Sequence, residues 1–192
     1  MVDAESQDLS AQPAQTLTKQ TLQRIVLTGF MGAGKSTVGR LLAQRLKWKL
    51  IDVDLAIEAN VGMTITDVFR LHGESYFRDL EYQTIGQFLD SNQLVLALGG
   101  GAIENDRTRA LIFSQPETQV VHLEVSLDTV LQRCKGTEGL RPILADRANL
   151  SSRYDRRLPL YRQAHRTVNV DSLPPEAVVD AVVKHFGLLA ET

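Results

Sequence analysis

The chain has 192 residues and a formal net charge of −2; 43% of its residues are hydrophobic and 23% are charged. These values are typical of a folded domain, and they exclude a wholly disordered chain, a collagen-like chain and a coiled coil. The near-neutral charge argues against a general nucleic-acid binder. Cys134 is the one cysteine, so a disulfide within the chain is impossible and a cysteine-based zinc site is disfavoured.

The first 23 residues form a polar segment rich in Gln, Ser and Thr. The segment lacks the apolar run of a secretory signal, and acidic residues near its start fit a transit peptide poorly. No stretch of about 18 apolar residues occurs in the chain, so we expect neither a membrane-spanning helix nor a membrane partner. The sequence predicts a disordered extension over residues 1–23, followed by one domain over residues 24–192 of a cytoplasmic protein.

Strands and helices alternate along the rest of the chain. Short aliphatic and β-branched runs predict strands, and apolar residues at helical spacing predict helices. In chain order we expect a strand over 25–28, a helix over 35–47, a strand over 50–53, a short helix from Thr64 to Gly73, a helix over 74–90, a strand over 94–98, a helix over 106–113, a strand over 119–123, a helix over 127–133, a helix over 150–163, a strand over 167–170, and a helix from Pro174 or Pro175 to Phe186. This alternation predicts an α/β fold with helices on both faces of a parallel sheet.

A glycine-rich segment follows the first predicted strand. Residues 29–36, G-F-M-G-A-G-K-S, match G-x-x-x-x-G-K-[ST] in full, with a strand before and a helix after. The glycines let the backbone wrap closely around phosphate oxygens, and the helix N-terminus favours the anion. We expect Lys35 to reach the β- and γ-phosphates and the Ser36 hydroxyl to bind Mg²⁺. The segment predicts a protein that binds ATP or GTP.

Two aspartates, Asp52 and Asp54, follow the second predicted strand. In an extended segment residues two apart point the same way, and a pair of carboxylates beside a phosphate loop can serve a metal and a hydroxyl group. The third and fourth strands supply no aspartate, so Asp52 is the best candidate to help hold Mg²⁺. A solvated strand end or a helix cap is an equally good explanation of the pair taken alone.

Two further features have a structural and a functional interpretation. Residues 99–101 are three glycines after the third strand; they form either a flexible turn or a backbone surface for a small ligand. Arg78 and Glu81 are either a surface ion pair, or a pair in which Glu81 aims Arg78 at a ligand carboxylate. Because the phosphate loop, the aspartates and the glycines all follow parallel strands, we expect them to form one site at the carboxyl edge of the sheet.

Residues 131–166 are basic, with nine Lys and Arg against three Asp and Glu. Within this segment, residues 135–148 lack periodicity and contain glycines and a proline, which predicts a mobile loop. A basic, glycine-containing loop suits a lid that closes over a polyphosphate. Nucleic acid is the rival partner, but neither a recognition motif nor an aromatic-rich basic strand accompanies the charge.

Taken together, these segments resemble the shikimate kinase family over residues 24–186. The resemblance is carried, in order, by G-F-M-G-A-G-K-S-T, I-D-V-D-L-A-I-E, G-M-T-I, G-E-S-Y-F-R-D-L-E, G-G-G, L-R-P-I-L and R-L-P-L-Y. It implies a three-layer α/β/α P-loop kinase with a five-stranded parallel sheet in the order 2-3-1-4-5 and a mobile lid over about residues 135–148. It also implies ATP-dependent phosphorylation of the 3-hydroxyl of shikimate to shikimate 3-phosphate, on the route to chorismate and the aromatic amino acids.

The resemblance further implies roles for single residues. Asp54 would face the substrate hydroxyls and could act as base, and the lid arginine Arg141 would reach over both substrate and γ-phosphate. The shikimate carboxylate would be held by Arg78 and Arg157, beside a pocket lined by the backbone of Gly99, Gly100 and Gly101. The ATP contacts would come from Gly32, Ala33, Gly34, Lys35, Ser36, Thr37, Arg133, Lys135, Arg141 and Pro175. Either Arg133 or Lys135 would stack on the adenine, and Pro174 or Pro175 would flank it.

Ser36 and Asp52 would serve Mg²⁺, the expected cofactor, and the expected partners are shikimate and ATP, with a monomer as the family state. One rival is another small-molecule kinase on the same fold, such as a gluconate kinase; the family-specific strings argue against it. A second rival is a nucleotide-binding regulatory module without turnover. Such a module would be expected to lack Lys35, an aspartate or Arg141, and all of these are present.

Overall fold

The structure of the protein, a computed structural model, describes residues 22–135 and 147–188. A five-stranded sheet lies at its centre, made of β1 (Arg24–Thr28), β2 (Lys49–Asp52), β3 (Leu94–Ala97), β4 (Thr118–Glu124) and β5 (Arg166–Asn169). Every pairing is parallel, and the strand order is β2-β3-β1-β4-β5. The expected α/β class and the expected strand order 2-3-1-4-5 are both confirmed.

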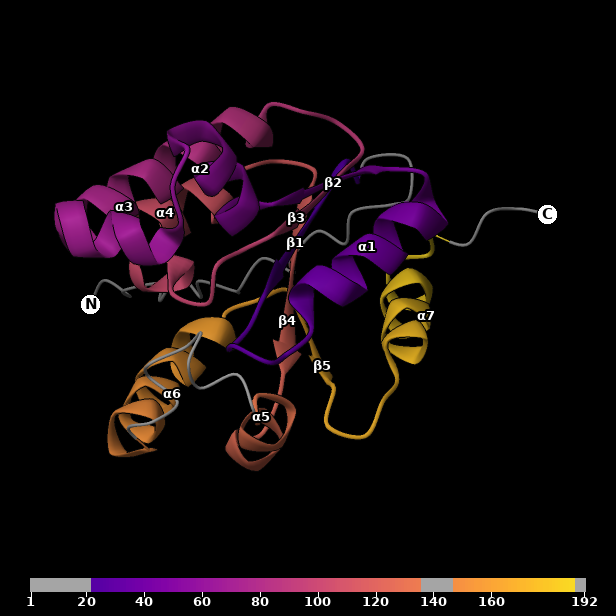
Figure 1. The fold of residues 1–192 in the computed structure, drawn as a ribbon. Coiled ribbons are helices and arrows are strands. Elements are labelled where there is room, and N and C mark those ends of the chain that lie inside the picture. Colours follow the sequence, from indigo (N-terminus) through magenta and orange to yellow (C-terminus); the bar gives the residue numbers. More distant parts are fainter. Residues whose placement is uncertain (1–21, 136–146, 189–192) are drawn as a thin grey trace, which may run out of the picture.

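Helices cover both faces of this sheet, with α1 and α7 on one side and α2, α3 and α4 on the other; α5 and α6 lie near the end of the sheet where β4 finishes (Figure 1). The bounds are α1 (Lys35–Leu46), α2 (Val53–Val61), α3 (Ile65–Leu89), the short 3₁₀ helix η1 (Ala102–Glu104), α4 (Asp106–Phe113), α5 (Leu127–Arg133), α6 (Arg147–Tyr161) and α7 (Pro175–His185). Pro175 is the first residue of α7 and Pro174 its N-cap, which decides between the two prolines that the sequence left open.

The core is divided by the sheet into two clusters. Ile25 and Leu27 of β1 pack with Leu42 of α1, whereas Val26, between them, packs with Ile85 of α3 on the opposite face. Successive strand side chains point to opposite faces, so one continuous apolar run can supply both clusters. The rigid sheet that results places the loops after β1, β2 and β3 at one edge.

Helix α2 is the one α-helix among the described residues that the sequence did not predict. The expected strand continued through Val53, but β2 ends at Asp52, whose Oδ1 accepts a hydrogen bond from the Leu55 backbone N–H at 3.4 Å as the N-cap. Val53 and Ile57, four residues apart, are both buried on the inner side of α2. The expectation that Asp52 and Asp54 point the same way along an extended segment is therefore wrong, because Asp54 lies in the first turn of a helix.

Helix α3 contains both helices that were predicted around Gly73. The predicted start at Thr64 is confirmed, since Thr64 is the N-cap and its Oγ1 accepts a hydrogen bond from the Asp67 N–H at 3.1 Å. Gly73 does not end the helix as predicted. It forms a local break between two helical halves, with φ of 80° and ψ of 175°. The chain resumes its helix at once, so the two halves form one element.

Several predictions fall at the limits of the described residues. The segments 1–21, 136–146 and 189–192 lie outside them, and with them most of the predicted extension and the predicted lid, including Arg141. Leu22 is already buried in the core, and the Gln23 N–H donates to the Glu117 carbonyl at 2.9 Å, so packed chain is present two residues before the expected start of the domain. At the other end of the predicted lid, residues 147 and 148 belong to α6 rather than to a loop. Within the described part of the chain, no helix is long and apolar enough to span a membrane.

Candidate active site

The loop after β1 has the geometry of a phosphate cradle. A Cβ placed on Gly29 would lie 2.5 Å from the Leu123 carbonyl oxygen, so the close approach of this loop to β4 requires glycine. Gly34 has a φ of 87° and caps the N-terminus of α1. Lys35 Nζ donates to the carbonyls of Gly29 at 2.8 Å and Phe30 at 3.1 Å, so its ammonium group is held over the loop itself.

Two oxygen donors meet beside this loop. The Ser36 hydroxyl donates to Asp52 Oδ2 at 2.6 Å, although the two residues are 16 apart in the sequence. Asp52 Oδ1 caps α2, which confirms the helix-cap alternative, while Oδ2 faces Ser36 and the role of metal ligand stays a prediction. A hydroxyl and a carboxylate are hard oxygen donors of the kind that Mg²⁺ uses together with water and substrate phosphates, so this donor set fits the ion.

A cavity of about 240 Å³ opens on the other side of the loop. Arg133 borders it and donates to the carbonyls of Gly32 at 3.2 Å and Val170 at 2.6 Å, which ties α5 to the phosphate loop and to the end of β5. The lining residues are Gly32, Ala33, Gly34, Thr37, Val38, Arg133, Val170, Leu173, Pro175 and Val178. Six of the expected ATP contacts are brought together here, whereas Lys135 is not among the lining residues.

Two carboxylates approach the glycine run that follows β3. A Cβ on Gly99 would lie 2.7 Å from Asp54 Oδ1 and 2.9 Å from Glu81 Oε1. Burial raises the pKa of Asp54, the neighbouring Asp52 carboxylate raises it further, and the Lys35 ammonium opposes both effects. Burial also raises the pKa of the fully buried Glu81 to about 7, against the opposing effect of Arg78. The glycine at position 99 is therefore what lets the backbone pass beside two carboxylates.

Two guanidinium groups lie at the far end of the same glycine run. A Cβ on Gly101 would lie 2.5 Å from Arg78 Nη2 and 3.1 Å from Arg157 Nη2. Arg78 Nη1 donates to Glu81 Oε2 at 2.7 Å, and because Glu81 is fully buried, the alternative of a surface ion pair is wrong. Arg157 is 5% exposed. Paired guanidinium groups are suited to binding a carboxylate.

Two residues of this region were missed by sequence reasoning. Glu104 in η1 accepts from Arg157 Nε at 2.8 Å and from Arg156 Nε at 2.8 Å, and the Tyr161 hydroxyl donates to the Gly100 carbonyl. Tyr161 could have been found, because it is four residues after Arg157 and so shares its face of α6. No pattern in the sequence marks Glu104, whose partner is 53 residues away.

His122 and Cys134 lie in the packed interior of the protein. The ring of buried His122 stacks on Tyr161 with centroids 5.1 Å apart, and burial lowers the pKa of His122 to about 4. Cys134 is buried, and its Sγ would lie 3.2 Å from a Cβ placed on Gly32. Among the residues that the structure describes, no group of three or more His, Cys, Asp or Glu is arranged to hold a metal.

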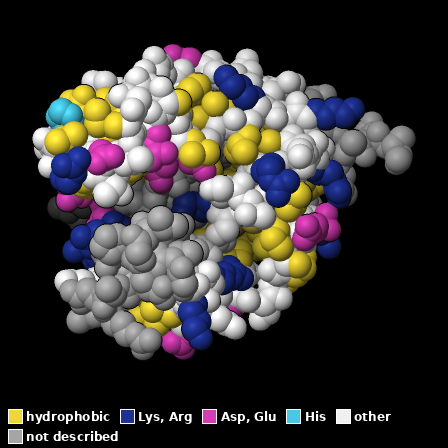
Figure 2. Space-filling view, viewed as in Figure 1, with side chains coloured by type: hydrophobic (Ala, Val, Ile, Leu, Met, Phe, Trp, Pro, Cys, Tyr) yellow, Lys and Arg dark blue, Asp and Glu magenta, His cyan; other side chains and the backbone are white. Residues whose placement is uncertain are grey.

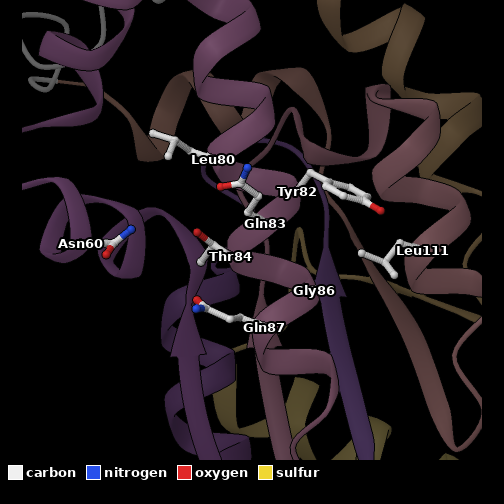
Figure 3. A pocket seen from close by; sticks show the side chains of 8 residues that line it. All are labelled: Asn60, Leu80, Tyr82, Gln83, Thr84, Gly86, Gln87 and Leu111. Carbon is white, nitrogen blue, oxygen red and sulfur yellow. The ribbon is translucent and has the colours of Figure 1, made fainter.

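Two further features of the described residues add nothing to the predicted site: a surface over α2 and α3, and a second cavity. Figure 2 shows acidic and hydrophobic side chains together over α2 and α3, the elements that carry the exposed Leu55, Leu71 and Tyr76. A cavity of about 370 Å³ lies beside α3 and contains none of the predicted site residues. Its lining comes from α2, α3 and α4, as Figure 3 shows: Asn60, Leu80, Tyr82, Gln83, Thr84, Gly86, Gln87 and Leu111.

Comparison with known proteins agrees with this arrangement. A model of the shikimate kinase family matches residues 31–186. The shikimate kinase of Persephonella marina is 38% identical over 164 residues, which cover 84% of this chain and 98% of that protein. The structure of shikimate kinase from Acinetobacter baumannii in complex with shikimate has a TM-score of 0.80 and 33% identity, covering 89% of this chain and 97% of that one.

A gluconokinase from Sinorhizobium meliloti is also similar in structure, with a TM-score of 0.55. Its identity to this chain is 22%, so that likeness shows a common fold and nothing more specific. The family match, by contrast, runs from the phosphate loop to the end of α7. The chain belongs to the shikimate kinase family.

Proposed function

We propose that this protein transfers the γ-phosphoryl group of ATP to the 3-hydroxyl of shikimate, giving shikimate 3-phosphate and ADP. One observation carries the proposal: a complete phosphate loop, the partly buried carboxylate of Asp54 and the neighbouring guanidinium groups of Arg78 and Arg157 meet at one edge of the sheet. The relative from Persephonella marina is a shikimate kinase, and the Acinetobacter baumannii enzyme was solved with shikimate bound, which supports the same substrate here.

Asp54 would accept the proton of the attacking hydroxyl. Burial and the Asp52 carboxylate raise the pKa of Asp54 above its ordinary value, which makes the carboxylate a stronger base. Gly99 keeps the space beside Asp54 Oδ1 free of a side chain, so a hydroxyl can approach there. Phosphoryl transfer depends mainly on positioning and on neutralising charge, and Lys35 would supply a positive charge once it leaves the carbonyls of its own loop for the phosphates.

Arg78 and Arg157 would hold the shikimate carboxylate. Each guanidinium already has a carboxylate partner, Glu81 for Arg78 and Glu104 for Arg157, so both side chains are ordered before a ligand binds. Ordering the binding groups in advance lowers the entropic cost of binding. The backbone of residues 99–101 would line the same pocket.

The adenine would lie in the cavity of about 240 Å³ between Arg133 and Pro175. We assign the stacking role to Arg133 rather than to Lys135 because Arg133 borders that cavity and is anchored to the Gly32 and Val170 carbonyls. The role of Arg141 over the γ-phosphate stays a prediction from the family resemblance, since Arg141 lies outside the described residues.

Ser36 and Asp52 would hold Mg²⁺ through their facing oxygens. When bound there, the ion would neutralise charge on the β- and γ-phosphates. A cytoplasmic location, a monomeric state, and the division into an extension over residues 1–23 and a domain over 24–192 remain predictions.

The proposal is tested by following ADP release with shikimate or gluconate as acceptor, and by identifying the phosphorylated product by mass spectrometry. We expect ADP release that depends on shikimate and is abolished by EDTA, and only background release with gluconate. Faster turnover of gluconate would favour the other small-molecule kinase. ATP binding without turnover of either acceptor would favour a regulatory module.

A further inference from the structure

Glu104 accepts a hydrogen bond from Arg157, one of the two arginines that the proposed function assigns to the substrate carboxylate. We propose that Glu104 is a positioning residue for the acceptor substrate: it holds the Nε–Nη2 edge of Arg157, so that the guanidinium stays beside the glycine run and leaves Nη1 to bind the substrate carboxylate. The inference rests on the proposed function, because it needs Arg157 to be a carboxylate ligand.

The contacts of Arg157 define which edge of its guanidinium is occupied. Nε donates to Glu104 Oε2 at 2.8 Å, and Nη2 lies 2.7 Å from the same oxygen. Neither contact uses Nη1, which would lie 3.7 Å from a Cβ placed on Gly100. An arginine held by one edge can still offer its other donors to a second carboxylate, because the five N–H groups form a rigid planar fork.

Electrostatics give the second reason for a carboxylate at this place. The Nη2 atoms of Arg78 and Arg157 both lie within about 3 Å of the position that a Cβ on Gly101 would take, and the Arg157 side chain is 6% exposed, so water screens their repulsion poorly. Glu81 neutralises Arg78. Glu104 does the same for Arg157, and without it a nearly buried guanidinium would be left without its carboxylate partner, which is costly.

Glu104 stays charged at neutral pH. Burial raises the pKa of Glu104, but the hydrogen bonds from Arg157 and Arg156 outweigh burial and hold the pKa below its ordinary value. A charged Glu104 gives Arg157 the stronger, charge-assisted kind of hydrogen bond. Removing the charge of Glu104 should therefore weaken the positioning of Arg157 and, through it, the binding of the substrate carboxylate.

Arg156 offers a matched control. It donates to the other oxygen of Glu104, Oε1, at 2.8 Å, and its side chain is 59% exposed. An Arg156→Gln substitution removes one of the two ion pairs of Glu104 and leaves the Arg157 pair intact. Exposed ion pairs are worth little, so this variant should behave as wild type.

The test measures the Kd of shikimate by calorimetry, the KM values of shikimate and ATP, kcat, and thermal unfolding. The variants are Glu104→Gln, Glu104→Asp and Arg156→Gln. We expect Glu104→Gln to raise the Kd and KM of shikimate about tenfold, the usual effect of losing one charge-assisted hydrogen bond, with the KM of ATP and kcat within about twofold. Glu104→Asp keeps the charge, so it should bind shikimate more tightly than Glu104→Gln and less tightly than wild type. If the Gln variant fails to fold, the comparison of Glu104→Asp with wild type decides the test.

Several outcomes would overturn the assignment. An unchanged shikimate Kd in Glu104→Gln would show that Arg157 needs no positioning carboxylate, and a tighter Kd would show that Glu104 competes with the substrate. Equal losses for ATP and shikimate would indicate a general structural role. Wild-type protein that binds no shikimate would overturn the proposed function itself, which is a result distinct from any of these.

Discussion

Lys35 has partners in its own loop before any phosphate is present. Its ammonium group donates to the carbonyls of Gly29 and Phe30, so the fold sets its position. Neutral carbonyls attract an ammonium group less strongly than phosphate oxygens do, because the phosphate oxygens carry negative charge. Lys35 can therefore exchange these partners for the phosphates of ATP at little cost.

We expect Lys35→Met to lower kcat by about 10²–10³, the usual effect of removing one donor that stabilises transition-state charge. Steady-state kinetics with shikimate and ATP measure the loss, and thermal unfolding checks that the fold is intact. Lys47→Met is the matched control, because Lys47 is an exposed lysine at the C-terminal end of the same helix, α1. Equal losses in both variants would show that Lys35 acts through α1 rather than through phosphate.

Asp52 shows how far reasoning from single residues can go. The sequence offered a helix cap and a metal ligand as alternatives; the structure shows the cap through Oδ1 and places Oδ2 beside the Ser36 hydroxyl. Its neighbour Asp54 lies beside Gly99, but it stands on a helix rather than in the expected extended strand. Residue chemistry was readable from the sequence, whereas the direction of the side chains was not.

At the scale of elements, α3 owes its break to one residue. Gly73 has a φ of 80° and a ψ of 175°, a combination that essentially only glycine adopts, and nothing lies within 4 Å of a Cβ placed there. The requirement for glycine at this position comes from the backbone conformation and not from crowding. The break separates the Thr64 end of α3 from the half that carries Arg78 and Glu81.

Gly73→Ala should lower the free energy of unfolding by about 1–3 kcal/mol, because alanine is strained in that conformation. Gly86→Ala, in the regular part of α3, is the control. Its Cβ would meet Leu111 Cδ2 at an ordinary 3.6 Å, so it should stabilise the protein by roughly 0.5–1 kcal/mol. Urea unfolding of both variants gives the comparison. A loss in Gly86→Ala as large as that in Gly73→Ala would contradict the backbone explanation.

The elements themselves were predictable to different degrees. The bounds of α4 and α5 agree with the prediction, since each begins at a polar N-cap, Asn105 and Ser126. Helix α2 was missed because its nine residues directly follow β2 without a loop, and its β-branched start at Val53 continues the strand pattern. A short helix gives too few apolar repeats to be recognised by periodicity.

At the scale of the whole molecule, two buried groups oppose each other in their dependence on pH. Burial lowers the pKa of His122 to about 4 and raises the pKa of Glu81 to about 7. Between about pH 4 and 6.5 the unfolded state binds more protons at His122, so this group lowers stability as the pH falls. Between about pH 4.5 and 7 the folded state binds more protons at Glu81, so that group lowers stability as the pH rises.

The two contributions should partly cancel in the wild type and separate in the variants. Relative to wild type, His122→Phe should gain stability as the pH falls from 6.5 to 4, and Glu81→Gln should gain stability as the pH rises from 4.5 to 7. Each relative change should be on the order of 2 kcal/mol, in line with shifts of this size in buried groups. Urea unfolding at a series of pH values gives the curves; curves parallel to the wild type would contradict the assignment.

The sequence by itself determined the phosphate loop, the α/β order of elements and the family, because these depend on residues that are neighbours in the chain or recur at regular spacing. Only the tertiary structure decided that Glu104 holds Arg157 across 53 residues, and that Arg78 and Arg157 meet at Gly101. It also decided the burial that shifts the pKa values of Asp54, Glu81 and His122. Contacts between distant segments and the exclusion of water arise from packing, and no local pattern in a sequence records them.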